Sequence, residues 1–222
     1  MWRRLLLTGA VTLAVVALVP QRRTPARNEL RRVQYADQEI SVGKLLVAKP
    51  ELGDPNFANT VVLIVHYDEE NGAVGLTLNR KTNVPMSKVF PDTKGAKDDP
   101  IFEGGPVETG TAQALLRSRE KVDKSTHIFG DVYASGDKDV IEKSVSAGTT
   151  PATFRLYVGY GGWAAGQLER EIEMGGWSVL RGKPDIVFDD EPESLWQRLQ
   201  RQTETRIAFL VGPERPLLGN PY

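Results

Sequence analysis

The sequence contains no cysteine, and this absence excludes disulfide bonds, thiol nucleophiles and zinc sites built from thiolates. Histidine is almost as scarce: only His66 and His127 occur in 222 residues, which disfavours a metal site of several imidazoles. We therefore predict neither a metal ion nor a cofactor for this chain.

Catalytic motifs are also scarce. The G-x-S-x-G turn that presents a nucleophilic serine is missing. His66 ends an apolar stretch and His127 lies in a charged one, positions that favour structural histidines over catalytic bases. A Ser–His–Asp set stays open, because its members need not be neighbours in sequence, but no pattern points to one.

Basic charge is lacking outside the N-terminal segment. Seven of the 28 basic residues, all arginines, and one of the 29 acidic residues lie in residues 1–32. The rest of the chain holds 21 basic and 28 acidic side chains, a net charge of −7. Binding to a phosphate backbone depends on clustered Lys and Arg, so nucleic acid is an unfavourable partner for this part of the chain.

The chain has one long apolar run, Leu5–Val19, which Arg3 and Arg4 precede and Arg22 and Arg23 follow. Its length of about fifteen residues is shorter than the roughly twenty needed for a full membrane span. We predict a membrane anchor that holds the following domain on the cytoplasmic side, because the heavier arginine load follows the run. The alternatives are a protein that is soluble and cytoplasmic, exported or organellar after removal of this segment.

The rest of the sequence predicts an α+β fold. A continuous apolar run at 61–67 and Asn71-Gly72 indicate a buried strand followed by a hairpin. Later strands alternate with helices: we expect strands at 128–134, 154–158, 177–180, 185–188 and 206–212, and helices at 138–147, from 164 onwards and at 194–202. We predict three regions: an N-terminal hydrophobic segment and Arg-rich linker (1–39), a single compact domain (40–212) and a flexible tail (213–222).

The central stretch Phe154–Trp177 predicts a strand, a glycine turn and a helix. Gly159, Gly161 and Gly162 form the turn, and the pattern Gly159-Tyr-Gly-Gly-Trp-Ala164 fits G-x-G-x-x-A, which holds a pyrophosphate in dinucleotide sites. Three features disfavour a dinucleotide site here: the motif lies late in the chain, Trp163 is bulky, and Arg181 lies near the position where a ribose-binding acidic residue is expected. A glycine turn that lets aromatic rings pack closely explains the pattern without a ligand.

Two other stretches are candidates for binding. Gly104-Gly105-Pro106 could form a backbone nest for an anion near Arg80, or simply redirect a strand. The acidic residues Asp189, Asp190, Glu191 and Glu193 resemble ligands of a hard cation. Negative charge is also favourable at a helix N-terminus, so capping explains them without a metal.

Several of these stretches together resemble the YqgE/AlgH family, also called DUF179 or UPF0301. The matching motifs are Leu45-Leu-Val-Ala-Lys-Pro50, Asp54-Pro-Asn-Phe57, Gly75-Leu-Thr-Leu-Asn-Arg80, Gly104-Gly-Pro-Val107, Gly159-Tyr-Gly-Gly-Trp-Ala-Ala-Gly-Gln-Leu168, Trp177 and Phe188-Asp-Asp-Glu-Pro-Glu-Ser-Leu-Trp196. The chain departs from the family pattern at Thr111, Ala112 and Leu116, where an Arg-Gly pair and a His are common, and at Lys81, where Pro is common.

The resemblance implies a compact domain built on a mixed, largely antiparallel, partly open barrel-like sheet flanked by helices. About activity it implies little: the family is functionally unassigned, is often labelled a transcriptional regulator, and offers no catalytic residues to carry over.

The leading hypothesis is a non-enzymatic domain that binds a small anionic ligand or a protein partner. The candidate ligand-binding residues are Arg80, Gly104, Gly105, Gly159, Gly161, Gly162, Trp163 and Gln167. One alternative is an enzyme, a hydrolase or a nucleotide-using activity, sited at the same glycine-rich turns. The other is a transcriptional regulator, which the acidic domain disfavours.

Overall fold

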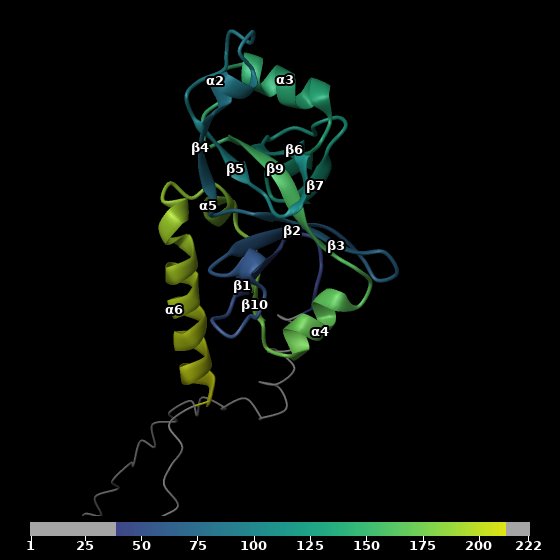
Figure 1. Cartoon of the computed structure of the whole chain (residues 1–222), viewed down its shortest axis with the longest axis vertical. Helices are drawn as coiled ribbons and strands as arrows, with labels where there is room; N and C mark the ends of the chain where they lie inside the picture. Colours follow the sequence, from purple (N-terminus) through teal and green to yellow (C-terminus); the bar gives the residue numbers. More distant parts are fainter. Residues whose placement is uncertain (1–38, 212–222) are drawn as a thin grey trace, which may run out of the picture.

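A computed structural model describes residues 39–211 of the chain, with side chains to residue 205. Ten strands form one open sheet, and five α-helices and a 3₁₀ turn surround it (Figure 1). The strands are β1 (Lys44–Ala48), β2 (Val61–Asp68), β3 (Gly72–Thr77), β4 (Lys81–Pro85), β5 (Pro100–Glu103), β6 (Val107–Arg117), β7 (Thr126–Phe129), β8 (Val132–Ser135), β9 (Phe154–Trp163) and β10 (Trp177–Arg181). The helical elements are η1 (Pro55–Phe57), α2 (Met86–Val89), α3 (Lys138–Ser146), α4 (Gln167–Glu173), α5 (Pro184–Val187) and α6 (Pro192–Val211).

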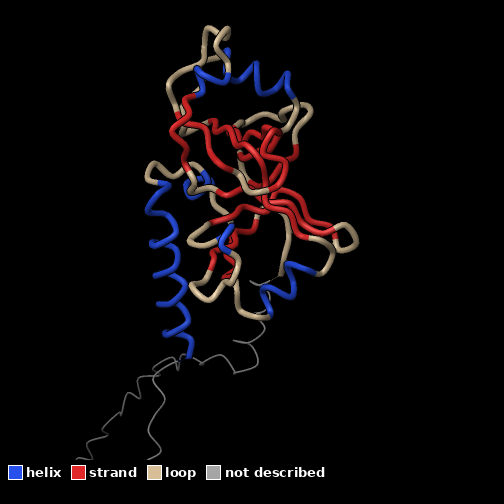
Figure 2. Tube along the Cα trace, viewed as in Figure 1, coloured by secondary structure: helices blue, strands red, loops and turns tan. Residues whose placement is uncertain are grey.

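The sheet runs in the order β10-β1-β2-β3-β9-β6-β8-β7, with β5 paired to both β4 and β9 off this path. Every strand pair is antiparallel except β5–β9. This arrangement confirms the predicted α+β fold with a mixed, largely antiparallel sheet that does not close. Figure 2 shows the strands crossing the middle of the molecule, with the helices at its periphery.

Strand β9 connects the two halves of this sheet. Its first residues pair with β6, from Ala112↔Val158 to Leu116↔Phe154, and with β5 at Phe102↔Tyr157. Its last residues pair with β3, from Gly75↔Gly161 to Ala73↔Trp163. In Figure 1, β9 accordingly runs between an upper group of strands (β4–β7) and a lower group (β1–β3 and β10).

The glycine turn predicted at 159–162 is therefore corrected. These residues lie inside β9, and α4 begins only at Gln167. The strand continues because Gly159 adopts φ = +68°, a backbone conformation that side chains other than glycine rarely accept. A kink at one residue thus replaces the turn, and the strand passes from one set of partners to the other.

The core forms on both faces of the sheet. The apolar run at the start of β2 is fully buried, as expected for a strand covered on both sides. One buried cluster joins the two groups of strands and the start of α6; among its members are Leu45, Leu63, Phe102, Leu115, Tyr157, Val187, Phe188 and Leu195. Two further clusters lie beneath α4 and beneath α3.

Helix α6 is longer than the sequence predicts, and the strand expected at 206–212 is wrong, because residues 206–211 belong to this helix. Its buried residues Leu195 and Leu199 are four apart, the spacing of one helical face. Trp196 fixes the helix on the sheet, since its indole N–H donates to the carbonyl of Ala48 at 2.7 Å. The strand expected at 185–188 is also wrong: Pro184 begins the short helix α5, where its missing N–H costs nothing.

Elements that depend on short-range polar interactions are predicted correctly from the sequence. The side chain of Asp137 caps α3 by accepting from the N–H groups of Asp139 and Val140, which confirms the predicted helix start. The β2–β3 hairpin forms as predicted, and Asp68 accepts three hydrogen bonds from Glu70 and Asn71 in its turn. In each case the donor and the acceptor lie within a few residues of one another, so the local sequence is enough to predict the interaction.

The prediction of a membrane-anchored protein is corrected. Over residues 39–211, no helix combines the length and the apolar character needed to cross a bilayer. The run Leu5–Val19, on which that prediction rested, lies outside the described residues, as does the tail at 213–222. The anchored localisation is withdrawn.

Candidate functional site

The structure brings the two glycine motifs of the sequence into direct backbone contact. A Cβ atom at Gly104 would lie 2.2 Å from the carbonyl oxygen of Gly159. A Cβ at Gly105 would lie 2.4 Å from the amide nitrogen of Gly161, and one at Gly159 would lie 2.4 Å from the carbonyl oxygen of Gly105. The two chains therefore fill the space that side chains would occupy, and the glycines are explained by close packing of β9 against the start of β6.

Arg80 lies beside this contact. Its guanidinium forms an ion pair with Glu103 at 2.9 Å, and its carbonyl accepts from the N–H of Glu103 at 2.8 Å. The cation expected near the glycine bend is thus present, and it is already paired to a carboxylate.

Trp163 and Gln167 lie at the other end of β9, in a second cluster. One oxygen of Glu171 accepts the indole N–H groups of Trp163 and Trp177, at 3.0 and 2.9 Å, and its other oxygen accepts from Gln167 at 2.9 Å. Phe57 stacks on Trp163 with ring centroids 5.1 Å apart. The predicted ligand-binding residues are therefore divided between two packed clusters, and their role in binding stays a prediction.

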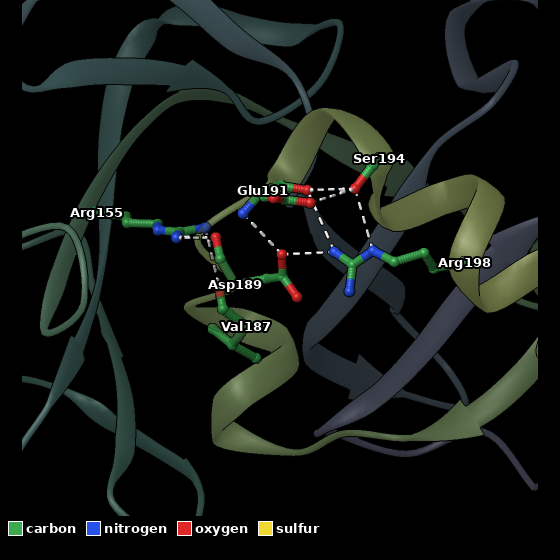
Figure 3. A network of polar contacts seen from close by, with 6 residues as sticks. All are labelled: Arg155, Val187, Asp189, Glu191, Ser194 and Arg198. Carbon is green, nitrogen blue, oxygen red and sulfur yellow. Dashed lines mark hydrogen bonds and ion pairs between the residues drawn. The ribbon is translucent and has the colours of Figure 1, made fainter.

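A cleft of about 450 Å³ opens elsewhere, between the end of β6 and the segment that joins α5 to α6. We call it the Arg117–Arg198 cleft; its lining is Arg117, Ala152, Asp185, Phe188, Asp189, Asp190, Glu191 and Arg198. Part of its polar network is drawn in Figure 3. The lining residues come from three separate parts of the sequence, which only the folded chain brings together.

Arg155 of β9 supports the back of this cleft. It is 3% exposed, and its guanidinium donates to the carbonyl of Pro151 and to those of Val187 and Asp189, the last two of which are drawn in Figure 3. No carboxylate pairs with it within the described part of the chain. A buried cation held only by carbonyl dipoles fixes the segment 187–189 to the sheet, and leaves its positive charge close to the cleft.

Phe188 lies next to two guanidinium groups. The Cζ atoms of Arg117 and Arg155 are 5.9 and 5.8 Å from the centroid of its ring, within cation–π range. The ring is 5% exposed and Arg155 is 3% exposed, so their contact excludes water, whereas the side chain of Arg117 is 32% exposed. The inner wall of the cleft is therefore aromatic and cationic.

The arginines of the cleft are oriented by neighbouring acids. Arg117 pairs with Asp131 at 2.8 Å. Arg198 pairs with Asp189 at 2.6 Å and donates from Nε to the hydroxyl of Ser194 at 3.1 Å (Figure 3). The hydrogen bond with Asp189 raises the pKa of Arg198 above its ordinary value, so this group is a fixed positive charge.

The acidic residues at the start of α6 act through the backbone and through arginine. Asp189 accepts the N–H of Glu191 at 2.9 Å, a local turn that lies just before α6, which begins at Pro192. Glu193 pairs with Lys81 at 2.9 Å, and this hydrogen bond lowers the pKa of Glu193. Across the described residues, no three His, Cys, Asp or Glu side chains converge to hold a metal ion.

The two histidines do not line this cleft. His66 is exposed on β2, and His127 of β7 contacts the carbonyl of Gly130 at 2.9 Å through Nε2. His127 also lies against Tyr133, with ring centroids 5.0 Å apart. Neither is hydrogen-bonded to a serine, as a catalytic base for a hydroxyl nucleophile would be.

Sequence reasoning missed Arg117, Arg155 and Arg198. Nothing in the local pattern sets these arginines apart from the other basic residues. The one usable signal was the motif Phe188-Asp-Asp-Glu-Pro-Glu-Ser-Leu-Trp196, which supplies most of one wall.

Comparison with known proteins places the chain in a family. The AlgH-like family model, DUF179, matches residues 45–208. The chain belongs to this family. Relatives named only as UPF0301 proteins include one from Chlorobium phaeobacteroides, 35% identical over 187 residues that cover 82% of this chain and 97% of the relative. Another, from Streptomyces avermitilis, is 35% identical over 183 residues that cover 80% of this chain and 94% of the relative.

Solved structures agree with this assignment. The solution structure of AlgH from Pseudomonas aeruginosa matches with a TM-score of 0.62 and 30% identity, over 78% of this chain and 94% of that one. A crystal structure of a Corynebacterium diphtheriae protein matches with a TM-score of 0.64 over 78% of this chain and 93% of that one, and at 24% identity it supports the fold alone. The predicted family is confirmed, and the names of these AlgH-like relatives specify no activity.

Proposed function

We propose that this AlgH-like protein is a non-enzymatic binding domain, and that the Arg117–Arg198 cleft takes a small polar ligand bearing charges of both signs. The chemical class fits an amino acid or the end of a peptide. The observation that carries the proposal is the lining of the cleft, where two guanidinium groups and an aromatic ring lie beside four carboxylates.

The charges suggest how such a ligand would lie. An anionic group finds the partly exposed guanidinium groups of Arg117 and Arg198, with the buried cation of Arg155 beside Phe188. A cationic group finds carboxylates at the rim, where the side chain of Asp185 is 95% exposed. The sequence predicted a purely anionic ligand, but such a ligand would lie near four carboxylates and only two lining arginines. A ligand with charges of both signs is therefore more complementary to the cleft.

A binding role is also supported by the kind of side chains that line the cleft, which are arginines, carboxylates and an aromatic ring. General acid–base catalysis needs a group whose pKa is moved toward neutrality. The hydrogen bond with Asp189 raises the pKa of Arg198, which moves this group further from neutral pH. Among the residues of the described chain, the two histidines lie outside the cleft.

The test is a ligand screen on the full chain by thermal shift and by amide chemical shifts, using the twenty L-amino acids, dipeptides, dicarboxylates, inorganic phosphate and nucleoside monophosphates. A ligand at one hundred times its Kd adds about 2.7 kcal/mol to the free energy of unfolding. For a domain of this size, that corresponds to a rise in Tm of roughly 5–10 °C.

The variants Arg117→Ala and Arg198→Ala separate binding in the cleft from binding elsewhere. Arg201→Ala is the matched control, since Arg201 is an exposed arginine on the same helix and does not line the cleft. We expect at least one amino acid or dipeptide to stabilise the wild type and the control, and to lose its effect in both cleft variants. If no compound of the screen shifts the cleft amides, or if every effect survives both substitutions, the proposal is rejected. Chemical conversion of a bound compound would favour the enzyme alternative instead.

A further inference from the structure

A second cleft, of about 680 Å³, lies on the opposite group of strands and shares no residue with the Arg117–Arg198 cleft. We call it the acidic cleft; its lining is Glu39, Ile40, Tyr67, Glu69, Glu169, Ile172 and Glu173. The start of the described chain, the β2–β3 hairpin and α4 meet there. Four of its seven lining residues are glutamates, and none is basic.

The negative charge of this cleft is not neutralised by the described part of the chain. None of the ion pairs formed among the described residues includes one of the four glutamates. Glu169 and Glu173 are four residues apart on α4, a spacing at which like charges repel. The cleft therefore favours a cationic occupant.

Glu169 provides a second and more local indication. One of its oxygens accepts the hydroxyl of Tyr67 at 2.8 Å, and this hydrogen bond, with burial and nearby acids, raises the pKa of Tyr67 to about 12. Its other oxygen, Oε2, is buried and has no hydrogen-bond partner within the described residues. A buried carboxylate oxygen without a donor is unfavourable, and a guanidinium supplies the donors that it lacks.

We propose that the acidic cleft binds the arginine-rich segment 22–32 of the same chain. This segment contains Arg22, Arg23, Arg27, Arg31 and Arg32 and a single acid, Glu29. Six residues lie between Arg32 and Glu39 at the edge of the cleft, so the chain can span up to about 25 Å between these two residues. Because the segment is tethered to the cleft, its effective concentration there is on the order of millimolar, so modest contacts suffice.

The chemistry of arginine matches the cleft in two respects. Its planar guanidinium binds a carboxylate through two parallel N–H groups, as the glutamates require. Its methylene stem packs on apolar surface, which Ile40 and Ile172 provide beside the acids.

The first test compares amide spectra of two full-chain variants with those of the wild type. In one variant the five arginines of segment 22–32 are replaced by glutamine, and in the matched control Arg3 and Arg4 are replaced. We expect the amides of Tyr67, Glu69, Glu169 and Ile172 to shift in the five-arginine variant and to stay in place in the control. The same amides should shift in the wild type when the salt concentration is raised to 0.5 M, because screening weakens exposed charge pairs. Unchanged cleft amides in the five-arginine variant overturn the proposal.

The second test adds a synthetic peptide of residues 21–35 to the full-chain five-arginine variant. We expect the peptide to restore the wild-type positions of the cleft amides, and to bind at least tenfold more weakly when Glu169→Gln and Glu173→Gln are also present. The control pair Glu142→Gln and Glu204→Gln, which lies outside the cleft on α3 and α6, should leave its affinity unchanged. The arginine substitutions could leave the cleft amides of the full chain unchanged while the added peptide still binds. That result would mean that the cleft takes a basic segment of another protein, and it also overturns the proposal. Since the two clefts share no residue, these results are independent of the ligand screen.

Discussion

Gly104 and Gly159 touch through their backbones: a Cβ on Gly104 would lie 2.2 Å from the carbonyl oxygen of Gly159. Both belong to sequence motifs that resemble phosphate-binding turns. Their contact holds β9 against the segment between β5 and β6, with the N–H of Gly104 donating to the carbonyl of Val158 at 2.8 Å. The requirement for glycine here is explained by packing between two strands, and needs no ligand.

The first prediction concerns this contact. Gly104→Ala places a methyl group against backbone atoms, which cannot move without disturbing the hydrogen bonds of Gly104 with Val158 and Thr77. We expect the free energy of unfolding to fall by about 3 kcal/mol or more, at the upper end for overpacking. Gly110→Ala is the control, since a Cβ there meets nothing within 4 Å, and it should change stability by less than about 1 kcal/mol. Denaturant unfolding followed by circular dichroism measures both, and equal effects would refute the packing explanation.

The second prediction concerns Glu171, whose carboxylate accepts both buried indoles. Trp163 and Trp177 are 4% and 2% exposed, so their N–H groups have no ready access to water if Glu171 is lost. Glu171→Leu should lower the free energy of unfolding by about 3 kcal/mol, because two buried donors lose their acceptor.

Glu171→Gln is the matched variant, since its amide oxygen can still accept from the indoles, and the loss should be about 1 kcal/mol. Chemical denaturation of the two variants at the same pH measures both losses of free energy of unfolding. If glutamine costs as much as leucine, the negative charge and not the hydrogen bonds is what the indoles require.

The sequence predicted features whose causes are local. The start of the helix predicted at 138–147 and the hairpin at Asn71-Gly72 are each determined within a few residues, and both are present. The class of sheet followed from the order of strands and helices. The kink in β9 was misread as a turn, because a glycine with positive φ serves equally in a turn and inside a bent strand. Which of the two forms depends on β3, β5 and β6, which are distant in sequence.

The candidate site was less accessible to sequence reasoning for the same reason. Arg155 looks like an ordinary strand residue, and only the fold shows that its guanidinium reaches the carbonyls of Val187 and Asp189, more than thirty residues away. Arg117 and Phe188 become neighbours only across the sheet. Long-range contacts between polar side chains and backbone leave no periodic trace in the sequence.

The third prediction tests Arg155 as the support of the cleft. Arg155→Met leaves the carbonyls of Pro151, Val187 and Asp189 without their donor, and we expect a loss of about 3 kcal/mol or more. Arg155→Lys keeps the charge but cannot reach three carbonyls with one ammonium group, so its loss should be intermediate. The exposed Arg201→Met should change stability by less than about 0.5 kcal/mol. Thermal unfolding of the three variants provides the ranking, and an Arg155→Met protein as stable as the control would contradict the assigned role.

The fourth prediction concerns Tyr157, which is fully buried in the core beside Phe102, with ring centroids 5.3 Å apart. Burial raises the pKa of its phenol from 10.0 to about 12, and the charge of nearby Arg155 only partly opposes the shift. The phenol oxygen has no hydrogen-bond partner among the described residues, since the guanidinium donates to carbonyls instead. Tyr157→Phe should therefore raise the free energy of unfolding at pH 7 by about 1 kcal/mol.

The same pKa sets the alkaline response of the protein. Because the folded pKa is raised, the contribution of Tyr157 is fully present below pH 10, where the unfolded phenol begins to ionise, and it is lost as the pH rises through about 12. A shift of this size corresponds to roughly 3 kcal/mol, and the wild type should lose about 2 kcal/mol of it relative to Tyr157→Phe between pH 9 and pH 12. Denaturant unfolding at steps of half a pH unit measures the difference, and the tyrosinate absorbance missing from the variant reports the pKa directly. Titration of that absorbance near pH 10 would show that water reaches Tyr157, and that the core around β9 is open where the structure has it closed.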